Sequence, residues 1–144
     1  MEYGALANAL RSKCSELEAF VNDVKGISFD TVWSGNAHDF MITSLNDLIM
    51  RTQVEITNIR IYADALDYLQ RYKNYQEKLT QYKSQYDSTP DTKEYKNKRI
   101  NLMSLINTLN GASSESIKII SNKLSSFVPI DSEIEVVTYD PSVE

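Results

Sequence analysis

The sequence predicts an all-α fold, an elongated helical hairpin that two further helices extend into a bundle. With four glycines and three prolines in 144 residues, the chain has few of the residues that a turn-rich β fold needs. Apolar residues recur at alternating spacings of three and four over two long stretches, which indicates helices that pack along a narrow seam. The sequence Trp33-Ser34-Gly35 separates these stretches and predicts the turn between two antiparallel helices.

The first helix is predicted to end near Gly26. Its seam positions are Tyr3, Leu6, Leu10, Cys14, Leu17, Val21 and Val24. Gly26 suits the left-handed conformation that follows many helices, and Lys25 lies in the last turn, where a cation is favourable. Because Cys14 falls on the seam, we expect a small buried apolar side chain there rather than a reactive thiol.

The second helix is predicted to be much longer than the first. Its seam comprises Met41, Leu45, Leu48, Thr52, Ile56, Ile59, Ala63 and Leu66, and it continues with Tyr68, Tyr72, Tyr75, Leu79, Tyr82 and Tyr86. No glycine or proline interrupts residues 36–89, so we expect one helix of ~50 residues, roughly 75 Å long. Just before it, Gly35 lets the chain turn tightly, at a positive φ or where a side chain would collide.

Two shorter helices are predicted to follow a break at Pro90, because a proline disfavours helical backbone at the residue before it. The third would run from Tyr95 to Gly111, fold back and cover the tyrosine positions of the second helix. Ser113 or Ser114 would then cap a fourth helix.

Residues 1–128 are accordingly expected to form one helical domain, and residues 129–144 an acidic tail or the start of a linker. The chain begins without the features of a signal peptide, and no apolar run reaches the length of a membrane span.

Charge and aromatic residues are unevenly distributed, with a basic segment in an acidic chain. The net charge is −5, yet residues 71–99 carry eight basic and four acidic side chains. Tyrosines alternate with Arg and Lys in this segment, a combination that can bind single-stranded nucleic acid. The tyrosines nevertheless keep the spacing of a helical seam, so packing or a protein partner is the preferred interpretation over nucleic acid or an anionic surface.

Few residues in the chain are suited to catalysis. His38 is the only histidine, which argues against a Ser-His or Cys-His pair and against a metal site with several histidines. We expect it to be a first-turn residue, with a pH-sensitive role beside Trp33 as the alternative. Asp64 and Asp67 have helical spacing and are expected on a solvated face. The sequence therefore predicts no enzyme, no cofactor and no bound metal.

The position of Trp33, Ser34 and Gly35 between two seam-patterned helices, with Phe40 five residues after the glycine, resembles the Trp-X-Gly (WXG) family. Members of that family are small helical hairpins exported by type VII secretion systems. The resemblance covers roughly residues 1–86 and implies a hairpin that forms homo- or heterodimeric four-helix bundles without catalysis of its own. The family also carries a C-terminal Tyr-X-X-X-Asp/Glu export signal, which none of the nine tyrosines here begins.

We therefore expect a non-catalytic helical assembly protein, a WXG-like type VII secretion substrate or the N-terminal targeting domain of a larger secreted effector. The alternative is a structural coiled-coil adaptor or spacer, of a phage or a cell surface, that type VII systems do not export. The expected partners are a helical protein or a second copy, and the export machinery, without nucleic acid or stable membrane insertion. The protein would be secreted or at the cell surface without a signal peptide, and otherwise cytoplasmic. The expected partner interface comprises Leu45, Leu48, Ile56, Ile59, Leu66, Tyr68, Tyr72 and Tyr75.

Overall fold

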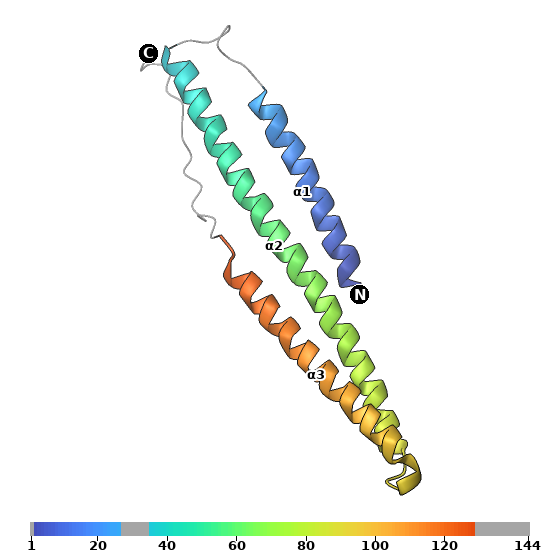
Figure 1. The fold of residues 1–144 in the computed structure, drawn as a ribbon. Coiled ribbons are helices and arrows are strands. Elements are labelled where there is room, and N and C mark those ends of the chain that lie inside the picture. Colours follow the sequence, from blue (N-terminus) through green and yellow to red (C-terminus); the bar gives the residue numbers. More distant parts are fainter. Residues whose placement is uncertain (1, 27–34, 129–144) are drawn as a thin grey trace. The chain divides into compact units, whose positions relative to one another are not determined.

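The computed structural model describes residues 2–26 and 35–128, and this part of the chain is all-helical, as predicted. Its elements are α1 (Tyr3–Lys25), α2 (Gly35–Ser88), the short 3-10 helix η1 (Lys93–Tyr95) and α3 (Lys96–Ser125), as Figure 1 shows. No strand occurs among the described residues.

Internal contacts divide the chain into two compact units, and each is described by itself. Unit 1 consists of Met1–Asn8 and Tyr62–Ser126, and unit 2 consists of Ala9–Ile61 and Phe127–Glu144. The long helices α1 and α2 each contribute residues to both units.

The ends of α1 and α2 follow the local signals in the sequence. After α1, the backbone N–H of Gly26 donates to the carbonyl oxygens of Asn22 and Asp23, at 3.1 and 3.2 Å. After α2, the hydroxyl of Thr89 donates to the carbonyl oxygen of Gln85 at 2.7 Å, and Pro90 follows. Since α2 has 54 uninterrupted residues, the prediction of one very long helix is confirmed.

The prediction of two helices after Pro90 is wrong, because α3 is a single helix of 30 residues that continues through Gly111. Ser113 does not cap a new helix: it is buried, and its hydroxyl accepts a hydrogen bond from Nε2 of Gln76 at 3.1 Å. A glycine inside a helix costs about 1 kcal/mol. The packing of α3 along α2 outweighs that local preference.

In unit 2, residues 9–25 of α1 lie beside the first half of α2 and run in the opposite direction (Figure 1). Cys14, Val21 and Ile56 form the buried core, with Leu17, Ile49 and Ile59 packed against it. The predicted burial of Cys14 is therefore confirmed, and its thiol lies 3.7 Å from the carbonyl oxygen of Ile56.

A buried amide joins α2 to the residue that follows α3 within unit 2. Nδ2 of Asn58 donates to the carbonyl oxygen of Val128 at 2.7 Å, and Oδ1 of Asn58 accepts from the backbone N–H of Val128 at 2.9 Å. Because Asn58 is only 2% exposed, this pair of hydrogen bonds satisfies an amide that would otherwise be costly to bury.

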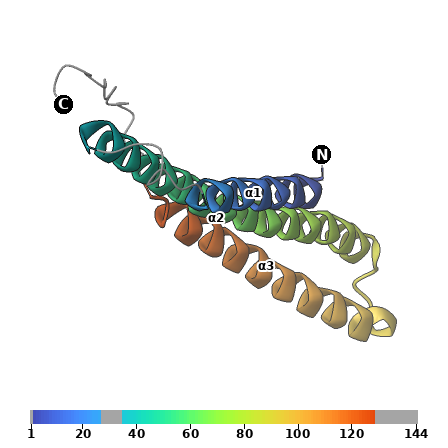
Figure 2. The same cartoon turned by 90° about the horizontal axis from the view of Figure 1, so that it is seen from above.

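In unit 1, α3 packs antiparallel along the second half of α2, as the views in Figures 1 and 2 agree. Successive contacts show the direction: Asp64 pairs with Lys123, Gln76 with Ser113, and Tyr86 with Arg99. The side of α3 that faces α2, which we call the inner seam, contains the buried residues Leu102, Ile106, Ser113 and Ser116. The prediction that a helix after Pro90 folds back onto the tyrosine positions of α2 is confirmed.

Candidate interaction surfaces

Of the predicted hairpin-turn motif, the structure describes only Gly35, at the start of α2. Its φ is +69°, a conformation that residues with a Cβ rarely adopt, so a glycine is required here. Trp33 and Ser34 lie outside the described residues. The Trp-Ser-Gly turn and the hairpin that it would join therefore stay predictions.

The predicted partner-interface residues of unit 2 fall into two groups. Ile56 is buried in the core with Cys14, and Ile59 packs against that core. Leu45 is half-buried, whereas Leu48 is exposed. Ile56 thus contributes to packing within the chain, and Leu48 is the residue of this group most accessible to a partner.

The predicted interface residues of unit 1 are Leu66, Tyr68, Tyr72 and Tyr75, and all four are half-buried. Tyr68 shows how the aromatic seam packs, because two cations flank its ring. The guanidinium of Arg71 lies 4.6 Å from the ring centroid and the ammonium of Lys123 lies 5.9 Å from it. Such contacts are favourable where water is partly excluded. The alternation of tyrosines with basic residues is thus used, at this position, for packing inside unit 1.

A second cation–aromatic contact lies at the other end of unit 1, between Arg99 and Tyr86. The guanidinium of Arg99 lies 4.1 Å from the ring centroid of Tyr86, and Nη1 donates to the carbonyl oxygen of Thr89 at 2.7 Å. Nε of Arg99 also lies 3.7 Å from the carboxylate of Asp91. Arg99 therefore binds a carbonyl just past the end of α2, where helix carbonyls lack helical partners.

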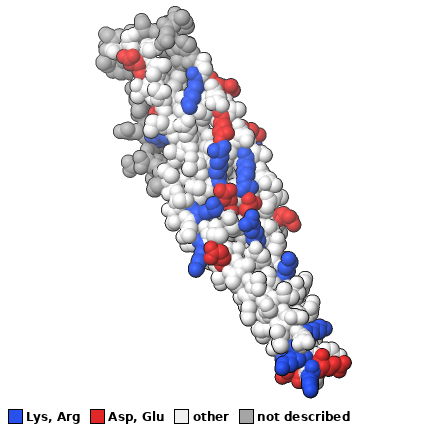
Figure 3. Space-filling model, viewed as in Figure 1, with Lys and Arg blue, Asp and Glu red and all other residues white. Residues whose placement is uncertain are grey.

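The remaining charges near this end are of both signs. Lys93, Lys96 and Lys98 are exposed, and so are Glu94 and Asp91. Blue and red atoms accordingly mix at the foot of Figure 3. A phosphate backbone needs a surface of predominantly positive charge, and the acidic residues weaken the potential of this one.

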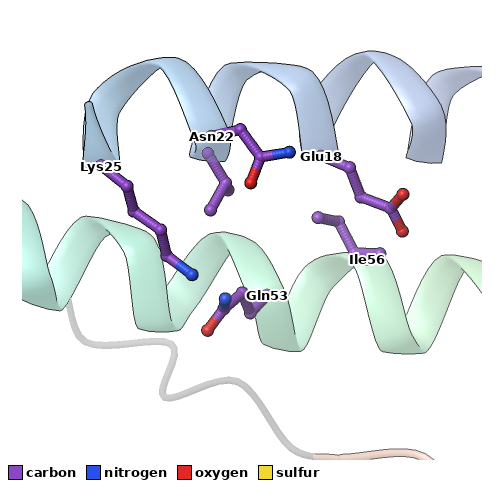
Figure 4. Close-up of a pocket in the computed structure, with 6 residues that line it drawn as sticks. Glu18, Asn22, Lys25, Gln53 and Ile56 are labelled. Carbon is purple, nitrogen blue, oxygen red and sulfur yellow. The ribbon is translucent and has the colours of Figure 1, made fainter.

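A small groove in unit 2 lies between α1 and α2, with a cavity volume of about 230 Å³ (Figure 4). Its lining residues are Glu18, Val21, Asn22 and Lys25 of α1 and Gln53 and Ile56 of α2. The volume is below the roughly 300–1,000 Å³ of usual ligand pockets. The carboxylate of Glu18 is also paired with Arg60. The groove therefore gives no positive support to a substrate site.

The other residues considered for chemistry are also in ordinary surroundings. Nδ1 of His38 lies 3.4 Å from Oδ1 of Asp39, in the first turn of α2 as predicted. Asp64 is paired with Lys123 at 3.6 Å. Within residues 2–26 and 35–128, no three His, Cys, Asp or Glu side chains gather so that they could hold a metal ion. None of the helices in these ranges is both long and apolar enough to cross a membrane.

One surface was missed by reasoning from the sequence, the exposed side of α3. Ile100 and Met103 fall within the predicted third helix, and Ile117 and Leu124 follow the predicted cap of the fourth, but no surface was predicted there; all four are exposed. The signal that could have located them is a second series of residues at spacings of three and four. It becomes visible only when residues 96–125 are treated as one continuous helix.

Comparison of the chain with protein-family models, with curated proteins and with solved structures found no match.

Proposed function

We propose that this chain is a non-catalytic helical assembly protein, which acts by binding another helical protein. The observation that carries the proposal is the number of large apolar side chains that the helices leave exposed. They are Leu6 and Phe20 on α1, Leu48, Met50 and Tyr62 on α2, and Ile100, Met103, Leu105, Ile117 and Leu124 on α3. Single exposed apolar residues are normal, but series of them along a helix are typical of protein interaction sites.

Unit 2 supports this proposal through its small core. Among the described residues of unit 2, the buried apolar cluster consists of Cys14, Val21 and Ile56, while Leu48 and Met50 are exposed. When two helices pack against each other, each buries only one of its sides. A core as small as this cluster contributes little to the stability of the folded state. A helical partner placed on the exposed residues would complete a four-helix arrangement.

Within this role, we propose that the chain is a WXG-like type VII secretion substrate or the N-terminal targeting domain of a larger secreted effector. The support is the resemblance at Trp33-Ser34-Gly35 and the positive φ of Gly35 at the start of α2. The alternative is a coiled-coil adaptor or spacer that is not exported by this route. The length of α2, 54 residues without a break, favours that alternative.

A secretion experiment distinguishes the type VII substrate from the adaptor or spacer. The amount of full-length protein in the culture medium of the producing bacterium is compared with and without the type VII export ATPase. A secretion substrate disappears from the medium only in the ATPase-deficient strain, and an adaptor does not change. The Trp33→Ala variant should lower the exported amount if the turn is recognised, with unchanged helix content by circular dichroism. Export equal to that of the unmodified chain would contradict the role of Trp33.

A further inference from the structure

The exposed side of α3 carries a second regular seam, which we call the outer seam. Its members are Ile100, Met103, Asn107, Asn110, Ser114, Ile117, Ser121 and Leu124. They follow one another at alternating spacings of three and four, the pattern by which helices pack in coiled coils. All are exposed, and the apolar members are exposed by 55% (Ile100), 38% (Met103), 46% (Ile117) and 43% (Leu124). The seam is therefore regular, uncovered and three turns or more in length.

The outer seam is also free of charge. None of its eight members is Asp, Glu, Lys or Arg, and residues 100–114 contain no charged residue at all. The solvent-facing side of a helix normally carries charged residues, whereas the centre of a protein interface is depleted of them. In Figure 3 the stretch directly above the mixed charges at the foot is largely white, and blue and red atoms return further up. In its lack of charge, the seam is like the centre of an interface.

The order of the side chains points to a second copy as the occupant, because four of the six positions keep their residue type when the order is reversed, and Met103 then faces Ser114. From residue 100 to residue 117 the seam is Ile, Met, Asn, Asn, Ser, Ile. In an antiparallel pair of identical helices, Ile100 would face Ile117 of the second copy, and Asn107 would face Asn110. Apolar residues would then meet at both ends. At the centre, each amide can donate to and accept from the other, and such a buried amide pair fixes the register of a coiled coil.

Charge at the start of α3 selects the antiparallel direction. Lys96, the first residue of α3, is exposed and lies on the line of the outer seam, four residues before Ile100. A parallel pair would place Lys96 beside Lys96 of the second copy within the seam, which is unfavourable. In the antiparallel register, Lys96 faces the neutral Ser121.

We propose that the outer seam of α3 binds a second copy of this chain, antiparallel, with Ile100 against Ile117 and Asn107 against Asn110. This inference rests on the proposed function, the assembly of helical proteins, and it names the surface and the partner.

The first test is sedimentation equilibrium of the full chain over roughly a hundredfold range of concentration, because dimerisation depends on concentration. We expect Ile117→Glu to raise the dimer dissociation constant by about tenfold or more, since a carboxylate would enter an apolar layer. The matched control is Thr108→Glu, which introduces the same carboxylate at an exposed position of α3 outside the outer seam and should leave the constant unchanged. Circular dichroism checks that both variants keep their helix content.

Mixing variants tests the register. Ile100→Lys and Ile117→Glu should each associate weakly alone, and their equimolar mixture should recover association, because the new cation and anion would face each other.

The direction of the two helices is tested with Met103→Cys and Ser114→Cys under mild oxidation. A disulfide that forms only in the mixture supports the antiparallel pair, and one formed by Met103→Cys alone contradicts it. The unmodified chain controls for Cys14, which is buried.

Two outcomes would overturn the inference while leaving the proposed function standing. In the first, the chain is monomeric at every concentration but still depends on the export ATPase for secretion. In the second, the chain self-associates and Ile117→Glu associates as tightly as the unmodified protein, so that another surface is used.

Discussion

The two halves of α2 bury their seams in different ways. In unit 2 the seam is aliphatic, and Ile56 packs against Cys14 and Val21 with almost no exposed area. In unit 1 the seam is mostly aromatic: Leu79 is buried within it, and its tyrosines stay half-buried while cations lie over the rings of Tyr68 and Tyr86. Tyrosine keeps its hydroxyl at the water boundary, so an aromatic seam tolerates partial exposure. Stability should therefore depend on few residues in unit 2 and on more distributed contacts in unit 1.

The largest effect is expected from the core of unit 2. Ile56→Ala should lower the free energy of unfolding by about 2–4 kcal/mol, because it removes a buried side chain and leaves a cavity. Urea unfolding followed by circular dichroism measures the change. Leu48→Ala, an exposed position on the same helix, is the control and should cost no more than about 0.5 kcal/mol. Equal losses in the two variants would show that the core of unit 2 is not where the structure places it.

The next effect tests the polar contact of unit 2. Asn58→Ala should destabilise the protein by about 1–3 kcal/mol, because it removes two hydrogen bonds to the backbone of Val128. Amide hydrogen exchange by NMR should show faster exchange of the Val128 N–H in particular. Asn74→Ala is the control, since Asn74 is exposed on the same helix. Unchanged protection at Val128 would contradict the contact.

A smaller effect is expected from the cation in unit 1. Arg99→Lys should cost about 1–2 kcal/mol, because an ammonium does not reproduce the planar stacking on Tyr86 together with the hydrogen bond to Thr89. Thermal unfolding measures the loss. Arg71→Lys, at an exposed position, should change the stability by less. If both substitutions were neutral, the description of unit 1 as held by such contacts would fail.

The smallest change in stability is expected from Gly111→Ala, and whether it stabilises or destabilises the protein tests the continuity of α3. Gly111→Ala should stabilise the protein by about 0.5–1 kcal/mol, because alanine favours a continuous helix and the added Cβ meets no other atom within 4 Å beyond its chain neighbours and the adjacent backbone of α3. Had Gly111 ended a helix in the left-handed conformation, as its position in the sequence suggests, the same change would be destabilising. A lower melting temperature for Gly111→Ala would therefore favour two helices over one.

Much of the helical framework can be predicted from residue spacing and from the breakers. The seam of α1, Gly26 after its end, the unbroken run before Thr89 and the break at Pro90 all act within a few residues of the chain. The location of the exposed surfaces is harder to predict. Ile100 and Leu102 both belong to series with helical spacing, and only Leu102 is buried.

The sequence by itself determined that this chain is helical, where α1 and α2 end and that Cys14 is buried, because propensity, capping and periodicity are local properties. Only the tertiary structure decided that α3 continues through Gly111, which of its two seams faces α2, and where the amide of Asn58 finds its partners. The physical reason is that contacts between residues distant in the chain outweigh a local preference of about 1 kcal/mol at one glycine. The seam left outside by that packing is the surface that we propose for assembly.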